Sequence, residues 1–416
     1  MIDKNALRAF LLQRLPEGLD ILQNMVGINS FTGNPQGVNT LAEYTAQVFA
    51  PLGFSAEYVP SENPEFGNHL VLQRAGRSGR NIVMVSHLDT VFPPEEEQRN
   101  NFRWSVEGDR IFGPGTQDIK GGTVMIWLVL LSLQRFAPTV FADTAWTVLL
   151  DAAEERFCPD FGELCKARMN SGTAAALVFE SEGKGNTAYN MVLARKGRAT
   201  WRVTANGRAA HAGGKHKHGA NAIQQLGLTI QKIQALTDYS KNLTFNVGTI
   251  QGGTVSNRVP HEAVAEGEFR AFTPENFLEG KRNLLALGGN GEIRSADDGF
   301  PCCVKVEVLT ETRPWPRNPG TDMLYEFWRK AGQEVQSPTG WEERGGLSDG
   351  NLIWDVVPTL DGLGPWGDND HCSERSEDGS KLPEYVDASR FVPKAMVNTT
   401  AILHLLTPSI RQTDHS

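Results

Sequence analysis

The sequence predicts an α/β fold, namely an open doubly wound sheet with helices on both faces and a smaller inserted domain. Strand and helix patterns alternate through the first 180 residues, as they do in sheets that are covered by helices on both sides. Between residues 195 and 311 the order changes to β-α-β-β-α-β, which is the ferredoxin-like order. Polar residues follow three of the predicted strands, where open α/β sheets bind their ligands.

The elements of the larger domain follow from apolar spacing and from residues that end helices. Helical spacing occurs at residues 4–27 and 38–52, and Gly53 suits the left-handed conformation that often ends a helix. Another helix is predicted at about residues 121–134, after the glycine-rich stretch GPGTQDIKGG. The predicted strands of this domain span residues 68–74, 81–86, 145–150 and 174–180.

The inserted domain is predicted from four strands and two helices. Strand patterns occur in ATWRVTA, TFNVGTIQ, AVAEGEFRAF and CVKVEVLTE, and helical spacing occurs in NAIQQLGLTIQKIQAL. The second helix begins with Thr273 as the N-cap and Pro274 at the first helical position. We therefore predict one discontinuous domain (residues 1–194 and 312–416) and one inserted domain (residues 195–311).

Composition and charge narrow the class of protein. The 416 residues carry a formal net charge of -9 and no cluster of Lys and Arg, which argues against nucleic acid as a partner. The N-terminus lacks the apolar core of a signal peptide, and the longest apolar run (residues 124–133) is too short to span a membrane. The five cysteines show no CxxC spacing, which argues against a disulfide framework. We therefore expect a cytoplasmic protein that does not bind membranes.

Three predicted strands end in side chains that can bind metal ions. The stretch IVMVSHLDTVF contains His87 and Asp89, TVLLDAAEERF contains Glu154 and Glu155, and AALVFESEG contains Glu180. Ligands of open α/β sheets bind outside the carboxyl ends of the strands, so these side chains mark a candidate site.

Two glycine-rich loops add further candidates, Asp118 in GPGTQDIKGG and His371 in DGLGPWGDNDHCSE. Taken alone, each signal has a structural explanation, because a histidine at a strand end is more often hydrogen-bonded than metal-bound. A Glu-Glu pair is usually a solvated turn, and GPGTQDIKGG lacks the Gly-Lys-Ser/Thr ending of a phosphate-binding loop. Together the candidates form a nitrogen and oxygen ligand set that suits zinc, with cobalt and manganese as alternatives: His87, Asp118, Glu155, Glu180 and His371.

The order of these motifs resembles that of a known family, the dizinc exopeptidases and deacylases. That family includes glutamate carboxypeptidase, aminoacylase, acetylornithine deacetylase and succinyl-diaminopimelate desuccinylase. The shared motifs are HLDTV, GPGTQDIKGG, AAEE, VFE, GRAAHAGGKHKHGANA, NRVP and GLGPWGDNDHCSE. The resemblance covers about residues 20–405 and includes the inserted domain, which is a lid or dimerisation domain in that family. The branch that cleaves folates (carboxypeptidase G type) looks most similar in RPWPRN, GWEERGGLSDGN and EYVDASRF.

The resemblance implies two metal ions and a role for each ligand candidate. His87 and Glu180 would bind one ion, and Glu155 and His371 would bind the other. Asp118 would bridge both ions.

The resemblance also implies groups that support the chemistry. Asp89 would orient His87 through a hydrogen bond, and Glu154 would be the general base for a metal-bridging hydroxide. A cis peptide bond would follow Asp118. His211 in AAHAGG would donate to the oxyanion from the lid of the partner subunit, which implies a homodimer formed through the lid domain.

Substrate binding is implied for three residues of the inserted domain and its border. Asn257 in SNRVP and Arg270 in EFRAF match positions that hold a substrate carboxylate or line the cleft. Arg313 in ETRPWP matches an arginine that grips this carboxylate in relatives specific for glutamate. Alternatively, Arg313 pairs with Glu311 or another surface acid.

The sequence thus predicts a metal-dependent amide hydrolase for a small-molecule or short-peptide substrate with a free carboxylate. The leading hypothesis is a zinc carboxypeptidase that releases a C-terminal, glutamate-like amino acid from a peptide, folate or N-acyl conjugate. The alternatives are an N-acyl-amino-acid deacylase and a non-catalytic metal-binding homologue, although the presence of Glu154 argues against the latter. A dinucleotide-binding protein would need GxGxxG after its first strand, and that pattern is absent from the sequence.

Overall fold

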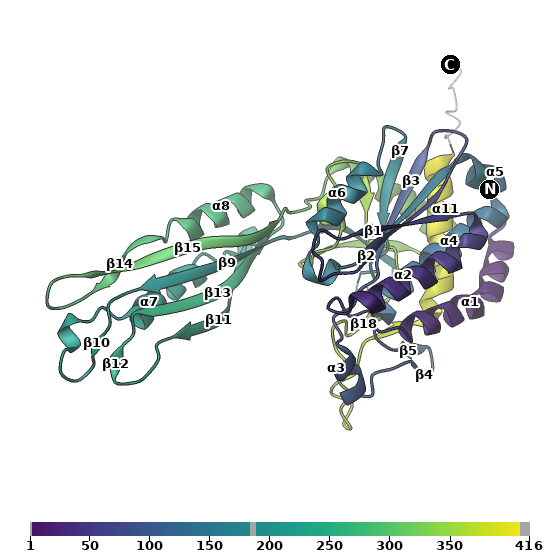
Figure 1. Cartoon of the computed structure of the whole chain (residues 1–416). Coiled ribbons are helices and arrows are strands. Elements are labelled where there is room, and N and C mark those ends of the chain that lie inside the picture. Colours follow the sequence, from purple (N-terminus) through teal and green to yellow (C-terminus); the bar gives the residue numbers. More distant parts are fainter. Residues whose placement is uncertain (1, 184–188, 408–416) are drawn as a thin grey trace, which may run out of the picture. The chain divides into compact units, whose positions relative to one another are not determined.

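The computed structural model describes residues 2–183 and 189–407, and the chain divides into two compact units (Figure 1). The first unit comprises Met1–Leu193, Arg317–Glu343 and Ser348–Ser416. The second unit comprises Ala194–Pro316 and Arg344–Leu347. Backbone hydrogen bonds between Trp315 and Arg195, and from Lys196 to Arg344, explain why the second unit ends where it does.

A six-stranded sheet forms the core of the first unit, in the order β1-β2-β6-β3-β7-β17. Strands β6, β3, β7 and β17 run parallel to one another, whereas β2 pairs antiparallel with β6 and β1 antiparallel with β2. The strands are β1 (Ser55–Pro60), β2 (Asn68–Arg74), β3 (Asn81–His87), β6 (Ala145–Asp151), β7 (Thr173–Val178) and β17 (Thr359–Leu360).

The side chains of this sheet alternate between two helix layers, which confirms the predicted doubly wound α/β fold. On β3, Ile82 and Met84 pack into the larger apolar cluster, whereas Val83 and Val85 pack on the opposite face with Phe161. The larger cluster contains α1 (Lys4–Val26), α2 (Pro35–Phe49), α4 (Gly121–Phe136), α9 (Pro319–Glu334) and α11 (Phe391–Leu406). The opposite face is covered by α6 (Pro159–Ala167) and α10 (Gly350–Ile353).

Helix α4 is a core helix of the first unit. By length and composition alone Thr116–Phe136 could span a membrane, but 78% of its most apolar window is buried inside the fold. A helix that is apolar on all sides is expected between packed layers. At its start, a Cβ on Gly122 would lie 2.0 Å from the carbonyl oxygen of Phe179. Glycine therefore lets α4 approach the end of β7, directly before Glu180.

Shorter elements complete the first unit. Four strands form a small sheet in the order β18 (Gly367–Asp368), β19 (Tyr385–Asp387), β5 (Arg110–Phe112) and β4 (Ser105–Glu107). A further pair of strands, β8 (Tyr189–Arg195) with β16 (Thr339–Arg344), has most of its residues in the first unit. The short helices and turns are η1 (Ala50–Leu52), α3 (Pro94–Arg99), η2 (Thr116–Lys120), α5 (Pro138–Asp143), η3 (Glu154–Arg156) and η6 (Ala388–Arg390).

The second unit has the predicted ferredoxin-like order with an added edge strand. Its antiparallel sheet has the order β11-β13-β9-β15-β14. The predicted elements are β9 (Gly197–Asn206), α7 (Ala222–Gln234), β11 (Thr244–Gly252), β13 (Glu262–Ala271), α8 (Pro274–Leu285) and β15 (Pro301–Thr312). The elements that were not predicted are β14 (Gly289–Arg294), the two-stranded ribbon β10 (Ala210–His211) with β12 (Arg258–Val259), and the turns η4 (His216–His218) and η5 (Tyr239–Lys241).

Several predicted element ends are confirmed, and others are shifted. The Thr273 side chain caps α8 by accepting the N–H of Asn276, and Gly53 adopts a left-handed conformation with φ of 86°. Helix α2 begins earlier than predicted, because Asn34 caps it and Pro35 occupies its first turn. Strand β7 ends at Val178, so Glu180 follows the strand instead of lying within it.

Candidate metal centre

Parallel strands bring the metal-binding candidates of the first unit to one edge of the sheet. Strand β3 ends at His87, which lies opposite Asp151 at the end of β6. Strand β7 pairs with the other side of β3. The chain then leaves β6 toward Glu154 and Glu155 and leaves β7 toward Glu180.

Asp118 lies between two histidine–glutamate pairs, and each of its carboxylate oxygens faces one pair. Its Oδ1 is 3.1 Å from Nε2 of His87, which is 3.6 Å from Oε1 of Glu180. Its Oδ2 is 3.4 Å from Nε2 of His371, which is 3.1 Å from Oε2 of Glu155. The structure thus brings all five predicted ligands together as two sets that share Asp118.

The loop that carries Asp118 is held by a residue far along the chain. The Asp118–Ile119 peptide bond is cis, as the resemblance implied. Oε1 of Glu384 accepts the N–H groups of Gln117 at 2.9 Å and of Asp118 at 3.1 Å. The Gln117 side chain also donates to the hydroxyl of Ser181 at 2.8 Å. The two hydrogen bonds to Glu384 fix the backbone from which the Asp118 carboxylate projects.

Asp89 organises the backbone beside the ligands as well as contacting His87. Nδ1 of His87 lies 3.1 Å from the Asp89 carbonyl oxygen and 3.4 Å from its carboxylate, so the closer contact is to the backbone. The Asp89 carboxylate accepts the Thr32 hydroxyl at 2.6 Å and the N–H groups of Glu154 and Glu155 at 3.1 and 3.3 Å. Asp89 therefore ties the end of β3 to the turn that carries both glutamates.

The acidic side chains at this edge of the sheet lie close together and are shielded from water. Burial raises the pKa of Glu155 to about 7, and the charge of Asp118 contributes to the rise. Burial also raises the pKa of Glu154 well above its ordinary value, and the charges of Glu180 and Glu155 add to this effect. Contacts with Asp118 and Glu155 raise the pKa of His371 to about 11. Protons or cations are therefore strongly favoured at this edge.

The donor groups fit a divalent metal ion. One donor atom each from His87, Asp118 and Glu155 lies within 4.8 Å of the others. Oε1 of Glu155 is buried and has no hydrogen-bond partner among the residues that the structure describes. Imidazole nitrogens and carboxylate oxygens are ligands of zinc, and also suit cobalt and manganese. A divalent cation would replace the protons that the crowded carboxylates otherwise retain.

Glu154 lies among the same charged side chains but is not a member of either histidine–glutamate pair. The charges of His87, Glu180, Glu155 and Asp118 all act on its carboxylate. Its backbone is fixed through Asp89, and it adjoins Glu155 in sequence. Glu154 is thus placed to act on a molecule held beside the ligands.

His211 lies on β10 of the second unit, and its ring has a defined proton position. Nδ1 accepts the N–H groups of Gly213 at 3.1 Å and Gly214 at 3.0 Å. In the neutral ring the proton must then reside on Nε2. The exposed His211 ring consequently presents a hydrogen-bond donor at Nε2.

The three predicted substrate-binding residues also lie in the second unit. Asn257 is exposed directly before β12, and its carbonyl accepts the N–H of Ala212. The Arg270 guanidinium is engaged by both carboxylate oxygens of Glu268 and by the carbonyl of Gly345, so a substrate would have to replace these contacts.

Arg313 is exposed directly after β15. The Glu311 carboxylate, which was an alternative partner for Arg313, accepts a hydrogen bond from Lys281 at 2.5 Å. Glu311 therefore forms an ion pair with Lys281.

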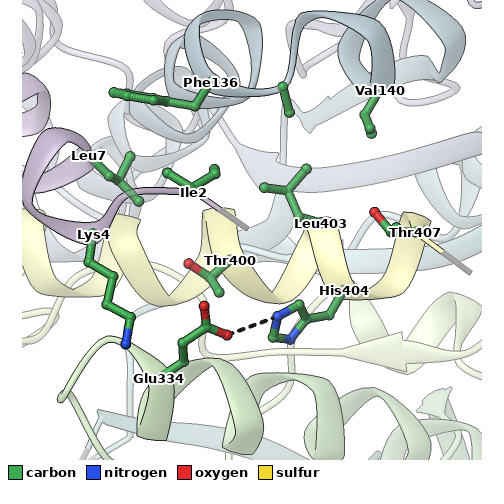
Figure 2. Close-up of a pocket in the computed structure, with 11 residues that line it drawn as sticks. Ile2, Lys4, Leu7, Phe136, Val140, Glu334, Thr400, Leu403, His404 and Thr407 are labelled. Atoms are coloured by element: carbon green, nitrogen blue, oxygen red, sulfur yellow. Dashed lines mark ion pairs between the residues drawn. The ribbon is translucent and has the colours of Figure 1, made fainter. Parts of the chain in front are cut away.

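A separate cavity of about 290 Å³ in the first unit contains none of the predicted site residues (Figure 2). Apolar side chains such as Leu7, Phe136 and Leu403 line much of it. Glu334 and His404 form an ion pair in its wall, with 3.1 Å between the carboxylate and Nε2. The candidate metal centre does not include this cavity.

Comparison with known proteins shows similarity to peptidases and deacylases. Residues 193–286 match the family described as the peptidase dimerisation domain. The chain is 28% identical to Carboxypeptidase G2 of Pseudomonas sp. (strain RS-16) over 94% of this chain and 89% of that protein. It is 22% identical to succinyl-diaminopimelate desuccinylase of Hydrogenovibrio crunogenus over 94% of this chain and all of that protein.

A solved structure shares the fold. The YXEP protein of Bacillus subtilis, described as a dinuclear metal-binding peptidase from the M20 family, superimposes with a TM-score of 0.63. The match covers 97% of this chain and 99% of that one, at 13% identity. The fold, the inserted domain and the histidine–carboxylate cluster together define a metallohydrolase. The chain is similar over most of its length to a carboxypeptidase and a deacylase, and its inserted domain matches a peptidase dimerisation domain.

Three residues beside the candidate metal centre were not predicted from the sequence, namely Glu384, Thr32 and Lys120. Glu384 opens the stretch EYVDASRF, which signalled the family but not the contact with the Asp118 loop. Lys120 is buried beside this loop and donates to the carbonyl of Ile28 at 3.2 Å. Burial lowers the pKa of Lys120 to about 8. All three contacts join segments far apart in sequence, so local patterns do not reveal them.

The Thr32 hydroxyl is predicted to stabilise the fold through Asp89. Thr32→Val should lower the free energy of unfolding by about 1–3 kcal/mol, because it leaves a buried carboxylate with one donor fewer. Thr90→Val is the matched control, since the Thr90 hydroxyl is buried and has no partner among the described residues. That variant should change stability little. Urea unfolding measures both, and equal losses would show that the bond to Asp89 does not stabilise the fold.

Proposed function

We propose that this hydrolase is a dimetal carboxypeptidase that releases a C-terminal, glutamate-like amino acid from a peptide, folate or N-acyl conjugate. The position of Asp118 between two histidine–glutamate pairs carries the proposal, because it provides two adjacent cation sites with one shared ligand. The similarity to Carboxypeptidase G2 over most of both chains supports the choice of reaction.

The five ligands divide into two sets in this proposal. His87 and Glu180 would hold one cation with Oδ1 of Asp118, and His371 and Glu155 would hold the other with Oδ2. Two bound divalent cations, which we propose are zinc, would polarise the scissile carbonyl and activate a water molecule. Three carboxylates oppose four positive charges, so the occupied site keeps a net positive charge for an anionic transition state.

Glu154 is the proposed general base and acid. Its carboxylate takes a proton from the attacking water as the new C–O bond forms. It then returns this proton to the amide nitrogen as the C–N bond breaks, so a carboxylic acid and an amine leave. Asp89 fixes the Glu154 backbone for this role through the hydrogen bond to its N–H group.

His211 is the proposed donor to the developing oxyanion. Because its Nδ1 accepts two backbone N–H groups, its Nε2–H is available to donate. We propose that the donor comes from the partner subunit of a homodimer. The match of residues 193–286 to a peptidase dimerisation domain supports this assembly.

The substrate is proposed to carry a free carboxylate. Arg313 would bind it in a fork of two charge-assisted hydrogen bonds, and Asn257 and Arg270 would line the cleft. An N-acyl-amino-acid deacylase is the second candidate function, favoured by the similarity to succinyl-diaminopimelate desuccinylase over 94% of the chain. Both reactions cut an amide next to a carboxylate and differ in the group beyond the scissile bond.

The cytoplasmic location is also a proposal.

Hydrolysis of a mixed substrate panel by the zinc-loaded protein tests the reaction. The panel contains N-acetyl amino acids, N-benzoyl and dipeptide conjugates ending in glutamate, and a folate, with products read by mass spectrometry. Release of glutamate from the larger conjugates is expected, and a chelator should abolish it until zinc is restored. Cleavage confined to acetyl or succinyl amino acids would identify the deacylase instead.

Glu154→Gln should retain bound metal and lose hydrolysis by about two to four orders of magnitude, because it removes the proton acceptor. Glu163→Gln on the exposed surface of α6 is the matched control and should keep the wild-type rate. Metal content and turnover are measured on the same samples. Near-normal turnover of Glu154→Gln would remove Glu154 from the mechanism.

Mixed dimers test the origin of His211. His211→Ala and Glu154→Gln should each be nearly inactive alone, the former because losing an oxyanion donor costs about 100- to 1000-fold. Random exchange of these subunits should restore about one quarter of the wild-type rate, because half of the dimers then hold one complete site. Activity that stays at the level of the separate variants would place His211 in its own subunit's site or outside the chemistry.

A further inference from the structure

A second group of metal-binding side chains lies in the first unit, on the face of the sheet that α6 and α10 cover. We call it the His69 cluster and define it as His69, Asp151, Cys158 and Asp160. His69 lies on β2, Asp151 ends β6, and Cys158 and Asp160 lie at the start of α6. None of the roles proposed above uses these four residues.

The donor atoms of the His69 cluster converge. Cys158 Sγ lies 2.9 Å from Oδ1 of Asp160 and 3.9 Å from Nε2 of His69. Nε2 of His69 lies 3.2 Å from Oδ2 of Asp160, and Nδ1 lies 3.2 Å from Oδ1 of Asp151. One donor atom each from His69, Asp151 and Cys158 lies within 4.8 Å of the others. In a tetrahedral zinc site, neighbouring ligand atoms are about 3.3–3.8 Å apart, so small side-chain movements suffice.

Hydrogen bonds within the His69 cluster do not satisfy all of its donors and acceptors. Asp151 is fully buried, and its Oδ2 has no partner among the residues that the structure describes. Its Oδ1 accepts the N–H of Ala153 at 2.9 Å. A buried carboxylate oxygen without a partner is costly, and a cation removes that cost. Burial and then the charge of Asp151 also raise the pKa of the Cys158 thiol, so a nearby cation is needed for a thiolate.

The surroundings of the His69 cluster suit a structural site. His69 and Cys158 are 1% and 2% exposed, and the His69 ring packs against Phe161 with 5.2 Å between ring centroids. The Asp160 side chain is 14% exposed, which provides a route for an ion from solvent. Structural zinc sites are closed to solvent, and the burial of His69 and Cys158 fits such a site.

We propose that the His69 cluster binds one divalent metal ion of the zinc class. Its ligands are the Cys158 thiolate, the His69 imidazole and the carboxylates of Asp151 and Asp160. Binding releases the thiol proton of Cys158 to water. Sulfur and nitrogen ligands with carboxylates favour zinc or cobalt over magnesium or calcium.

The bound ion fixes the chain that leads to the candidate metal centre. An ion on Nε2 of His69 moves the ring proton to Nδ1, so Nδ1 gives up its contact with the Ala152 N–H and donates to Oδ1 of Asp151, 3.2 Å away. The same carboxylate accepts the N–H of Ala153, which directly precedes Glu154. The site therefore stabilises the strand end and contributes no group to hydrolysis.

Cobalt binding tests the site, because a thiolate ligand gives cobalt(II) a charge-transfer band in the near ultraviolet. The candidate metal centre has only nitrogen and oxygen ligands, so its occupancy produces no such band. The metal-free protein is titrated with cobalt(II), and metal content is measured by mass spectrometry. Wild type should show the band and bind one equivalent more than Cys158→Ser, which should lack the band.

Control variants separate this site from other thiols and from the proposed function. Cys165→Ser, also buried on α6, and Cys372→Ser, beside His371, should both keep the band. His371→Ala should lose metal but keep the band, so failure of the proposed hydrolase would not affect this test. If Cys158→Ser does not fold, a variant with Ser at the other four cysteine positions should still show the band.

Equal metal content in wild type and Cys158→Ser, or a band that persists without Cys158, would overturn the proposal. The absence of any thiolate band in wild type would also overturn it. The His69 cluster would then be a hydrogen-bonded network alone.

Discussion

The structure of the site depends on the Asp118 carboxylate, whose two oxygens face two different histidine–glutamate pairs. One pair comes from the ends of β3 and β7, and the other comes from the turn after β6 and a distant loop. Without cations the carboxylates repel one another, and burial raises the pKa of Glu155 to about 7. In the proposed dimetal site, divalent ions on the two sides of Asp118 would offset this cost. Metal binding would then be coupled to the local fold.

The fold supplies the rigid frame that holds these charges together. Strand β3 is buried along its whole length and delivers His87 at a fixed position between β6 and β7. Gly122 lets α4 pack against the end of β7, and Glu384 fixes the loop before that helix. Asp89 accepts two N–H groups from the turn after β6. Long-range hydrogen bonds thus position side chains that local structure alone would leave mobile.

Much of this arrangement could be predicted from the sequence, and the reasons are physical. The β3 strand is a run of apolar residues that ends in His87, and such runs identify buried parallel strands. The β-α-β-β-α-β order followed from alternation and from the capping residues Thr273 and Pro274. The edge strand β14, GNGEIR, was missed because its glycines and polar residues lack a clear alternating pattern.

Contacts between distant segments were beyond prediction from sequence patterns. Asp89 was expected to orient His87 through a hydrogen bond, but the sequence did not indicate that the closer contact is its carbonyl oxygen or that its carboxylate accepts backbone N–H groups. Glu384 and the His69 cluster gave no local signal, because their partners lie far away in the chain.

The central claim is that Asp118 bridges two metal ions. Crystals of the zinc-loaded protein, measured for anomalous scattering at the zinc edge, test it most directly. The account predicts two peaks, one bound by Oδ1 of Asp118 with His87 and Glu180 and the other by Oδ2 with His371 and Glu155. A single peak at this edge of the sheet, or two ions of which only one contacts Asp118, would contradict it.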